Sequence, residues 1–73
     1  MFVRVKFTKS TFHQADANTR VPFAEGAFHF VEASLAERFI GDGAALFDSV
    51  PEQPGDVEAL AERFANAPRV EQE

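Results

Sequence analysis

Few side chains in this sequence could do acid–base, nucleophilic or metal chemistry, and their spacing does not bring them together. Neither of the two histidines, His13 and His29, stands in an HxxxH or HExxH spacing, which would place two metal ligands on one face of a helix. No serine stands in a GxSxG motif, so a Ser–His–Asp site would need residues that any domain contains. We therefore expect no catalytic residues, no metal site and a structural role for both histidines.

Carboxylates are plentiful, but paired acid–base chemistry needs a pocket that raises the pKa of one of them. A chain of 73 residues has little room for such a cleft. Residues 41–43 read GDG, but they follow a predicted helix and lack the lysine of a phosphate-binding loop, so we expect them to end that helix. The chain has no Cys and therefore no thiolate. The sequence predicts a protein that is not an enzyme and holds no cofactor.

The elements that would position these residues form a small α+β domain. Val3, Val5 and Phe7 alternate with polar residues, as in a strand with one buried face. Glycines at 41 and 43 are typical of a helix end. The expected order is a strand at 3–8, an exposed loop at 10–20, a strand at 27–31, a helix at 32–40 and a short strand at 44–47. This is a ββαβ-like fold with an appended C-terminal helix.

The composition past residue 50 indicates a boundary. Two Pro and one Gly within PEQPG cannot sustain regular structure, and Asp56 is a suitable N-cap for a helix that Pro68 would stop. The expected organisation is a domain at 1–50, a linker at 51–55, a helix at 56–67 and a polar tail at 68–73. The helix is predicted to run from Val57 to Ala67.

The C-terminal helix would carry one apolar stripe, because four residues follow the spacing i, i+3, i+4 and i+7. They are Val57, Leu60, Ala61 and Phe64. An isolated helix of this length is marginal in water, so the stripe must be covered by its own sheet, by a symmetry mate or by a foreign partner. We expect a docked but detachable helix without a hydrogen-bonded tie to the domain, and these four residues are the candidate partner-binding site.

Nine Phe, with no Trp or Tyr, indicate that the aromatic side chains build the core. The residues expected inside are Phe7, Phe28, Phe30, Leu35, Phe39 and Phe47. Since Phe28 and Phe30 point to the same side of one strand, His29 is expected to face solvent or the sheet edge.

Charge is unevenly distributed along the chain. Residues 1–20 carry four basic side chains against one acidic, a net charge of +3, whereas residues 21–73 carry three against eleven, a net charge of −8. The small basic set argues against nucleic-acid binding. No run of about 20 apolar residues could cross a bilayer, and the start lacks the continuous apolar stretch of a signal peptide, so we expect a cytoplasmic protein that does not bind membranes.

Residues 1–47 follow a pattern of a strand, a glycine turn, a strand ending in Val, a helix of the form LAExxIxxGxA and a short strand. The residues that carry this pattern are Gly26, Val31, Leu35, Ala36, Glu37, Arg38, Ile40, Gly43, Ala44 and Ala45. In this pattern the chain resembles small proteins encoded among bacteriophage head and tail genes. The resemblance implies a structural or assembly role in a phage or prophage particle, in the host cell or on the virion. It implies a protein partner, either a phage structural protein or a second copy of the chain.

A second function remains open on the residues alone. The net charge of −8 over residues 21–73 would suit a small acidic regulator that blocks the basic surface of a nucleic-acid-binding protein. Salt separates the two functions, because a complex built on charge weakens steeply with ionic strength and a contact built on Phe changes little.

Overall fold

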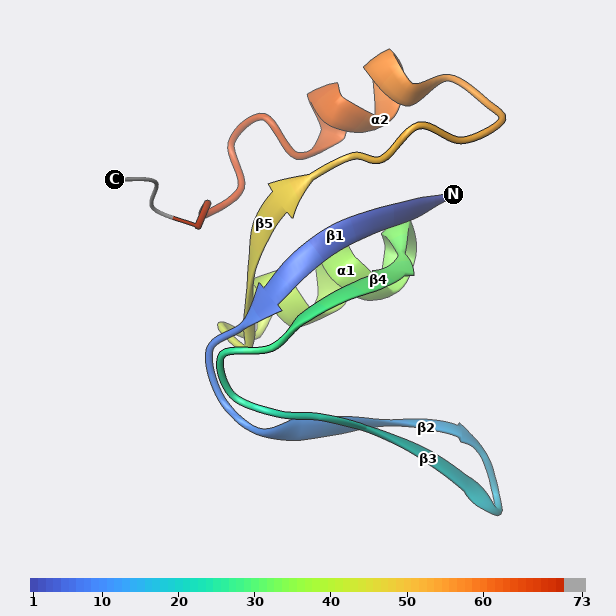
Figure 1. Cartoon of the computed structure of the whole chain (residues 1–73), viewed down its shortest axis with the longest axis vertical. Coiled ribbons are helices and arrows are strands. Elements are labelled where there is room, and N and C mark those ends of the chain that lie inside the picture. The colour runs from blue at the N-terminus through green and yellow to red at the C-terminus, as the bar shows by residue number, and fades with distance from the viewer. Residues whose placement is uncertain (71–73) are drawn as a thin grey trace.

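A computed structural model describes residues 1–70 of the chain, and over this range the predicted α+β class is confirmed. The elements, in chain order, are β1 (Phe2–Phe7), β2 (Thr11–Asp16), β3 (Thr19–Phe23), β4 (Phe28–Glu32), α1 (Ala33–Gly41), β5 (Ala45–Ser49) and α2 (Val57–Arg63). Figure 1 shows α1 behind the main sheet, α2 beside β5, and the β2–β3 hairpin extending away as an arm. The second expected strand, the first helix and the third expected strand are displaced by only one or two residues.

The main sheet has the order β4-β1-β5, and both outer strands run antiparallel to β1. The central strand buries the side that its alternation predicted, since Val3, Val5 and Phe7 are fully buried. The α1 helix connects β4 to β5 and covers this side of the sheet with Ala36 and Phe39. The core therefore lies between α1 and the face of β1 that carries these three apolar residues.

The expected loop at residues 10–20 is wrong, because most of it belongs to a second, two-stranded sheet made by β2 and β3. Ala17 and Asn18 form the turn, and the Asp16 carboxylate accepts a hydrogen bond from the Asn18 N–H at 2.8 Å. That bond lowers the pKa of Asp16. The hairpin is anchored at its base by Phe23, whose buried ring stacks on Phe7 with centroids 4.4 Å apart.

The GDG segment ends α1, as predicted. Gly43 has φ +76°, a left-handed conformation that an L side chain rarely adopts. Its N–H donates to the Ile40 carbonyl at 3.1 Å, and the Ala44 N–H donates to the Phe39 carbonyl at 2.9 Å. This pair of bonds is a Schellman motif, which satisfies two carbonyls at the helix end.

The second helix begins as predicted and ends early. The Asp56 side chain accepts a hydrogen bond from the Ala59 N–H at 3.0 Å, so Asp56 is the N-cap. The helix ends at Arg63 rather than Ala67, because the chain turns at residues 64–66 and returns to β5, where Pro68 and Val70 hydrogen-bond Phe47. Residues 71–73 of the expected tail lie outside the described residues.

The segment at 51–55 is tied to the sheet, contrary to expectation. The Phe2 N–H donates to Gln53 Oε1 and Gln53 Nε2 donates to the Phe2 carbonyl, both at 2.7 Å. Because β5 ends at Ser49, the Gln53 amide takes the place of a neighbouring strand beside the start of β1. The linker is therefore held by β1 instead of acting as a free hinge.

Candidate functional site: the open sheet face

The face of the main sheet that α1 does not cover carries three exposed aromatic rings and two cations. We call it the open face and define it by Phe2, Arg4, Lys6, Phe28 and Phe30. The exposed fractions are 52 % for Phe2, 39 % for Phe28 and 60 % for Phe30. Exposed apolar patches rimmed by polar residues are a feature of interaction sites.

The prediction that Phe28 and Phe30 lie inside is wrong, and strand register explains it. At the start of β4, the Phe7 N–H donates to the Ala27 carbonyl at 3.0 Å, so Phe7 stands opposite Ala27. Two residues further along, Val5 stands opposite His29. Since directly paired residues share a face, the odd-numbered residues of β4 turn toward the core and both Phe side chains turn outward.

His29 is accordingly half-buried instead of facing solvent. Its ring meets Phe23 edge-on at 4.9 Å between centroids and Phe7 at 5.8 Å. The predicted core positions Phe7, Phe39 and Phe47 are buried, and Leu35 is half-buried against them. The imidazole therefore completes an aromatic cluster, which is the structural role expected for it.

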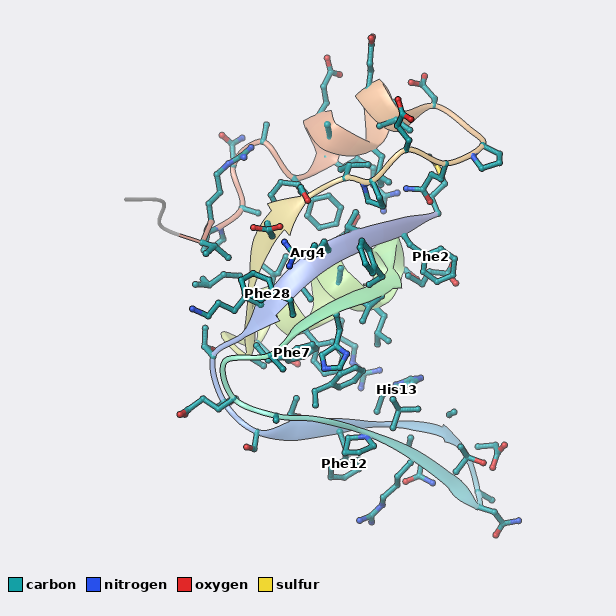
Figure 2. The ribbon with its side chains drawn as sticks, viewed as in Figure 1. Phe2, Arg4, Phe7, Phe12, His13 and Phe28 are labelled. Carbon is teal, nitrogen blue, oxygen red and sulfur yellow. The ribbon has the colours of Figure 1, made fainter. Side chains whose placement is uncertain are left out.

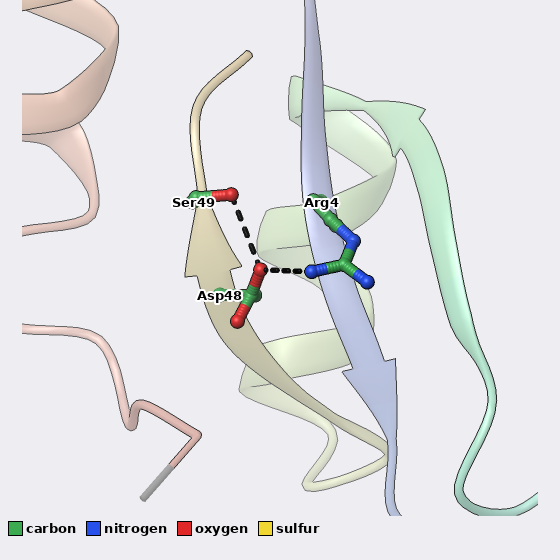
Figure 3. A network of polar contacts seen from close by, with 3 residues as sticks. All are labelled: Arg4, Asp48 and Ser49. Atoms are coloured by element: carbon green, nitrogen blue, oxygen red, sulfur yellow. Dashed lines mark hydrogen bonds and ion pairs between the residues drawn. The ribbon is translucent and has the colours of Figure 1, made fainter. Parts of the chain in front are cut away.

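Both cations of the open face lie over the ring of Phe28. The Arg4 guanidinium carbon is 4.2 Å from the centroid of Phe28, and Lys6 Nζ is 5.7 Å from the same centroid. Arg4 also donates to Asp48 Oδ2 at 2.8 Å, and Ser49 Oγ donates to the same oxygen at 3.1 Å (Figure 3). The carboxylate is largely buried, so this ion pair holds Arg4 in place over Phe28.

A groove lies between the hairpin and α1. It consists of two adjoining hollows of about 450 and 380 Å³, both lined by His13, Leu35 and Arg38. Figure 2 shows His13 on the side of the hairpin that faces the rest of the domain, opposite Phe12. Glu32 and Ser34 also line the first hollow, yet no hydrogen bond joins Ser34 to His13 among residues 1–70.

The charged side chains of the groove are accessible to solvent. Glu32, Arg38 and Asp42 are exposed, and the His13 imidazole is half-buried. The other two serines lie elsewhere, since Ser10 accepts from the Glu25 N–H and Ser49 contacts Asp48. Within residues 1–70, no three His, Asp or Glu side chains cluster as a metal site would require.

The predicted partner-binding stripe is split by the fold. Leu60 and Phe64 are buried in the domain's own core, whereas Val57 is half-buried and Ala61 is exposed. The stripe is thus covered by its own sheet, one of the three possibilities open on the sequence. A partner could reach Leu60 and Phe64 only after α2 had left the sheet, so that role stays a prediction.

The open face could have been predicted from the alternation of residues in β1, although not from the composition of the chain. Alternation in β1 places Phe2, Arg4 and Lys6 together on the side opposite Val3 and Val5. That side combines one aromatic with two cations, so it was recognisable as an exposed mixed face.

No helix among the described residues is long and apolar enough to cross a membrane. Comparisons of the chain with protein-family models, with curated proteins and with solved structures found no match.

Proposed function

We propose that this protein acts by binding other proteins, as a small structural or assembly protein of a phage or prophage, and that the open face is its binding surface. The observation that carries the proposal is the exposure of Phe2, Phe28 and Phe30 on a face that no element of residues 1–70 covers. The phage or prophage setting rests on the resemblance of residues 1–47 to proteins encoded among head and tail genes.

The residue types on the face favour a protein partner. Aromatic residues and Arg are enriched at the energetic centres of protein interfaces. Covering the exposed parts of three Phe rings contributes on the order of 5–10 kcal/mol at about 25 cal/mol per Å². Association itself costs about 4–15 kcal/mol, so a stable complex also needs polar contacts. Arg4 and Lys6 can supply them, since both lie at the rings.

The test is direct binding to phage head and tail structural proteins, measured by calorimetry with each purified protein. The double variant Phe2→Ser/Phe28→Ser is expected to weaken binding by tenfold or more. The matched control is Phe12→Ser, which removes a Phe of similar exposure (48 %) from the hairpin, where Arg20 lies over its ring. Equal affinities for the parent and the double variant would overturn the assignment of the face.

A second function, as an acidic regulator, is favoured by one observation. The solvent side of α2 and the segment before it present Glu52, Glu58 and Glu62, all exposed. A complex with a basic nucleic-acid-binding protein would use this surface. Its affinity would fall steeply with added salt and with Glu58→Gln/Glu62→Gln, whereas the open-face variant would leave it unchanged.

A further inference from the structure

The two edges of the main sheet differ in whether another segment pairs with them. Beyond β5, the Phe47 N–H donates to the Pro68 carbonyl at 2.8 Å and the Val70 N–H donates to the Phe47 carbonyl at 3.0 Å. The returning chain at residues 68–70 therefore covers that edge. On the other side, no strand among residues 1–70 pairs with the outer edge of β4.

The hydrogen bonds at the two ends of β4 identify its free backbone groups. The Ala27 carbonyl accepts from Phe7, and the Ala33 N–H donates to the Met1 carbonyl at 2.8 Å, so the odd-numbered residues turn their backbone groups toward β1. In an antiparallel pair these directions alternate along the strand. The N–H and C=O groups of Phe28, Phe30 and Glu32 thus point away from the sheet.

This edge has few of the features that keep edge strands from pairing, and Glu32 at its end is its one charged residue. Natural edges are commonly protected by Lys, by Pro or by a bulge. The sequence of β4, FHFVE, contains no Lys, Arg or Pro, and its pairing with β1 is regular from Phe28 to Glu32. Two of its five residues are exposed Phe. The strand is therefore suited to accept another strand.

We propose that the occupant of this edge is a second copy of the same chain, with the two β4 strands pairing antiparallel about a two-fold axis at Phe30. This inference rests on the proposed function, because it makes self-association one of the protein contacts. The outward backbone groups then match: Phe30 bonds Phe30 of the second copy, and Phe28 bonds Glu32 of the second copy. Facing Phe rings are favourable cross-strand pairs.

Charge complementarity selects a second copy over a foreign strand. Glu32 lies on the same side of β4 as Phe28 and Phe30, and no cation among residues 1–70 pairs with it. In the proposed register it stands opposite Phe28 of the second copy, whose ring lies beside Lys6 and Arg4 of that copy. Each Glu32 would therefore reach the Lys6 ammonium of the other chain, and the two-fold axis makes this contact twice.

The consequence is a continuous sheet in which the two open faces become one. The exposed rings of both copies would line a single surface, with the four cations around it. That surface doubles the apolar area available to a partner, which is what a tight complex requires when one copy's rings only balance the cost of association.

The first experiment measures the mass of the full chain by sedimentation equilibrium. The parent is expected to have twice the 8.1 kDa of one chain at micromolar concentration. Phe30→Pro removes an outward N–H and leaves the bonds to β1 intact, so it should weaken the dimer by about tenfold to a hundredfold. The control Phe30→Ala removes the ring but keeps the N–H, and it should weaken the dimer less. Unchanged melting of the monomer would verify that both variants fold.

The second experiment locates the interface by amide hydrogen exchange. The Phe28, Phe30 and Glu32 amides should exchange slowly in the parent. In Phe30→Pro, which has no amide at residue 30, the Phe28 and Glu32 amides should exchange rapidly, while His29 and Val31 stay protected in both proteins. Lys6→Glu or Glu32→Lys alone should weaken the dimer, and the two together should restore it.

A parent chain that stays monomeric, or a dimer with unprotected Phe28 and Phe30 amides, overturns the β4 pairing. These results are distinct from failure of the proposed function. A monomer that still binds a phage structural protein through Phe2 and Phe28 would leave that function standing. A dimer with protected amides that binds no such protein would overturn the function and keep the pairing.

Discussion

The rings of Phe47 and Phe64 stack with their centroids 5.1 Å apart and their planes 8° from parallel. Phe47 lies in β5, and Phe64 is the first residue after α2, so this contact joins the C-terminal helix to the sheet. Leu60, also buried, adds to the same core.

Truncating Phe64 should destabilise the whole domain rather than release a detachable helix. Phe64→Ala is expected to lower the free energy of unfolding by about 3–5 kcal/mol, because it leaves a cavity against Phe47. In a domain of this size each kcal/mol shifts Tm by about 4–8 °C, so calorimetry or circular dichroism will detect the loss. The control Phe12→Ala, at an exposed hairpin position, should change Tm little. A melting point within a degree or two of the parent would mean that α2 contributes no core.

A chain ending at Ser49 should fail to fold cooperatively. It lacks Leu60, Phe64 and the Gln53 amide, and it uncovers both Phe47 and the start of β1. The measurement is thermal unfolding together with amide exchange at Val3 and Val5. A cooperative transition with native protection at these two valines would instead support the predicted independence of residues 1–50.

The Gln53 side chain should contribute to the stability of the domain, although it lies in a polar linker. Gln53→Ala removes both hydrogen bonds to the Phe2 backbone and should cost about 1 kcal/mol, since each exposed bond contributes modestly. Gln53→Glu should cost a similar amount, because a carboxylate cannot donate to the Phe2 carbonyl. The control is Glu52→Gln, next to it and exposed. Urea unfolding compares the parent with these three variants. Equal midpoints for all four proteins would show that the hydrogen bonds between Gln53 and Phe2 do not contribute to stability.

The two glycines at the end of α1 should respond oppositely to Ala. Gly43→Ala places a side chain at φ +76° and should destabilise the domain by about 1–2 kcal/mol, although the site has open space around it. Gly41→Ala is in the helix with nothing within 4 Å of the new Cβ, so it should be neutral or stabilise by up to about 1 kcal/mol. Thermal melts of both variants show whether each substitution raises or lowers the stability of the domain. A destabilising Gly41→Ala with a neutral Gly43→Ala would contradict the Schellman end.

The hairpin turn should carry a pH-dependent contact. The Asn18 and Thr19 hydrogen bonds hold the pKa of Asp16 below the ordinary value of 3.8 in the folded chain. The unfolded chain therefore takes up this proton first, so the contribution is present above pH 3.8 and is lost as pH falls through the folded-state pKa. The Asn18 amide shift in NMR should follow that step, and Asp16→Ala should abolish it. A midpoint at or above 3.8 would be inconsistent with the turn.

Local signals in the sequence determined much of this fold. The alternation of Val3, Val5 and Phe7 identified the buried side of β1, Asp56 marked the start of α2, and Gly43 marked the end of α1. Each of these depends on residues within one turn or one strand, where backbone geometry and side-chain chemistry suffice.

Only the tertiary structure decided the rest. In FHFV, apolar or aromatic residues occupy both sides of the strand, so its inward side depends on how Ala27 meets Phe7, a contact between distant segments. The hairpin is mostly polar, and Phe23 is the one residue of 11–23 that is buried. Its sequence therefore has no alternation of apolar and polar residues that would predict strands. The stripe on α2 was evident, but its cover was not, since an amphipathic helix presents the same pattern to its own sheet and to a partner. The register of β4 and the packing of α2 depend on contacts between residues far apart in the sequence. Within either segment alone, the alternative arrangements would bury equally apolar residues.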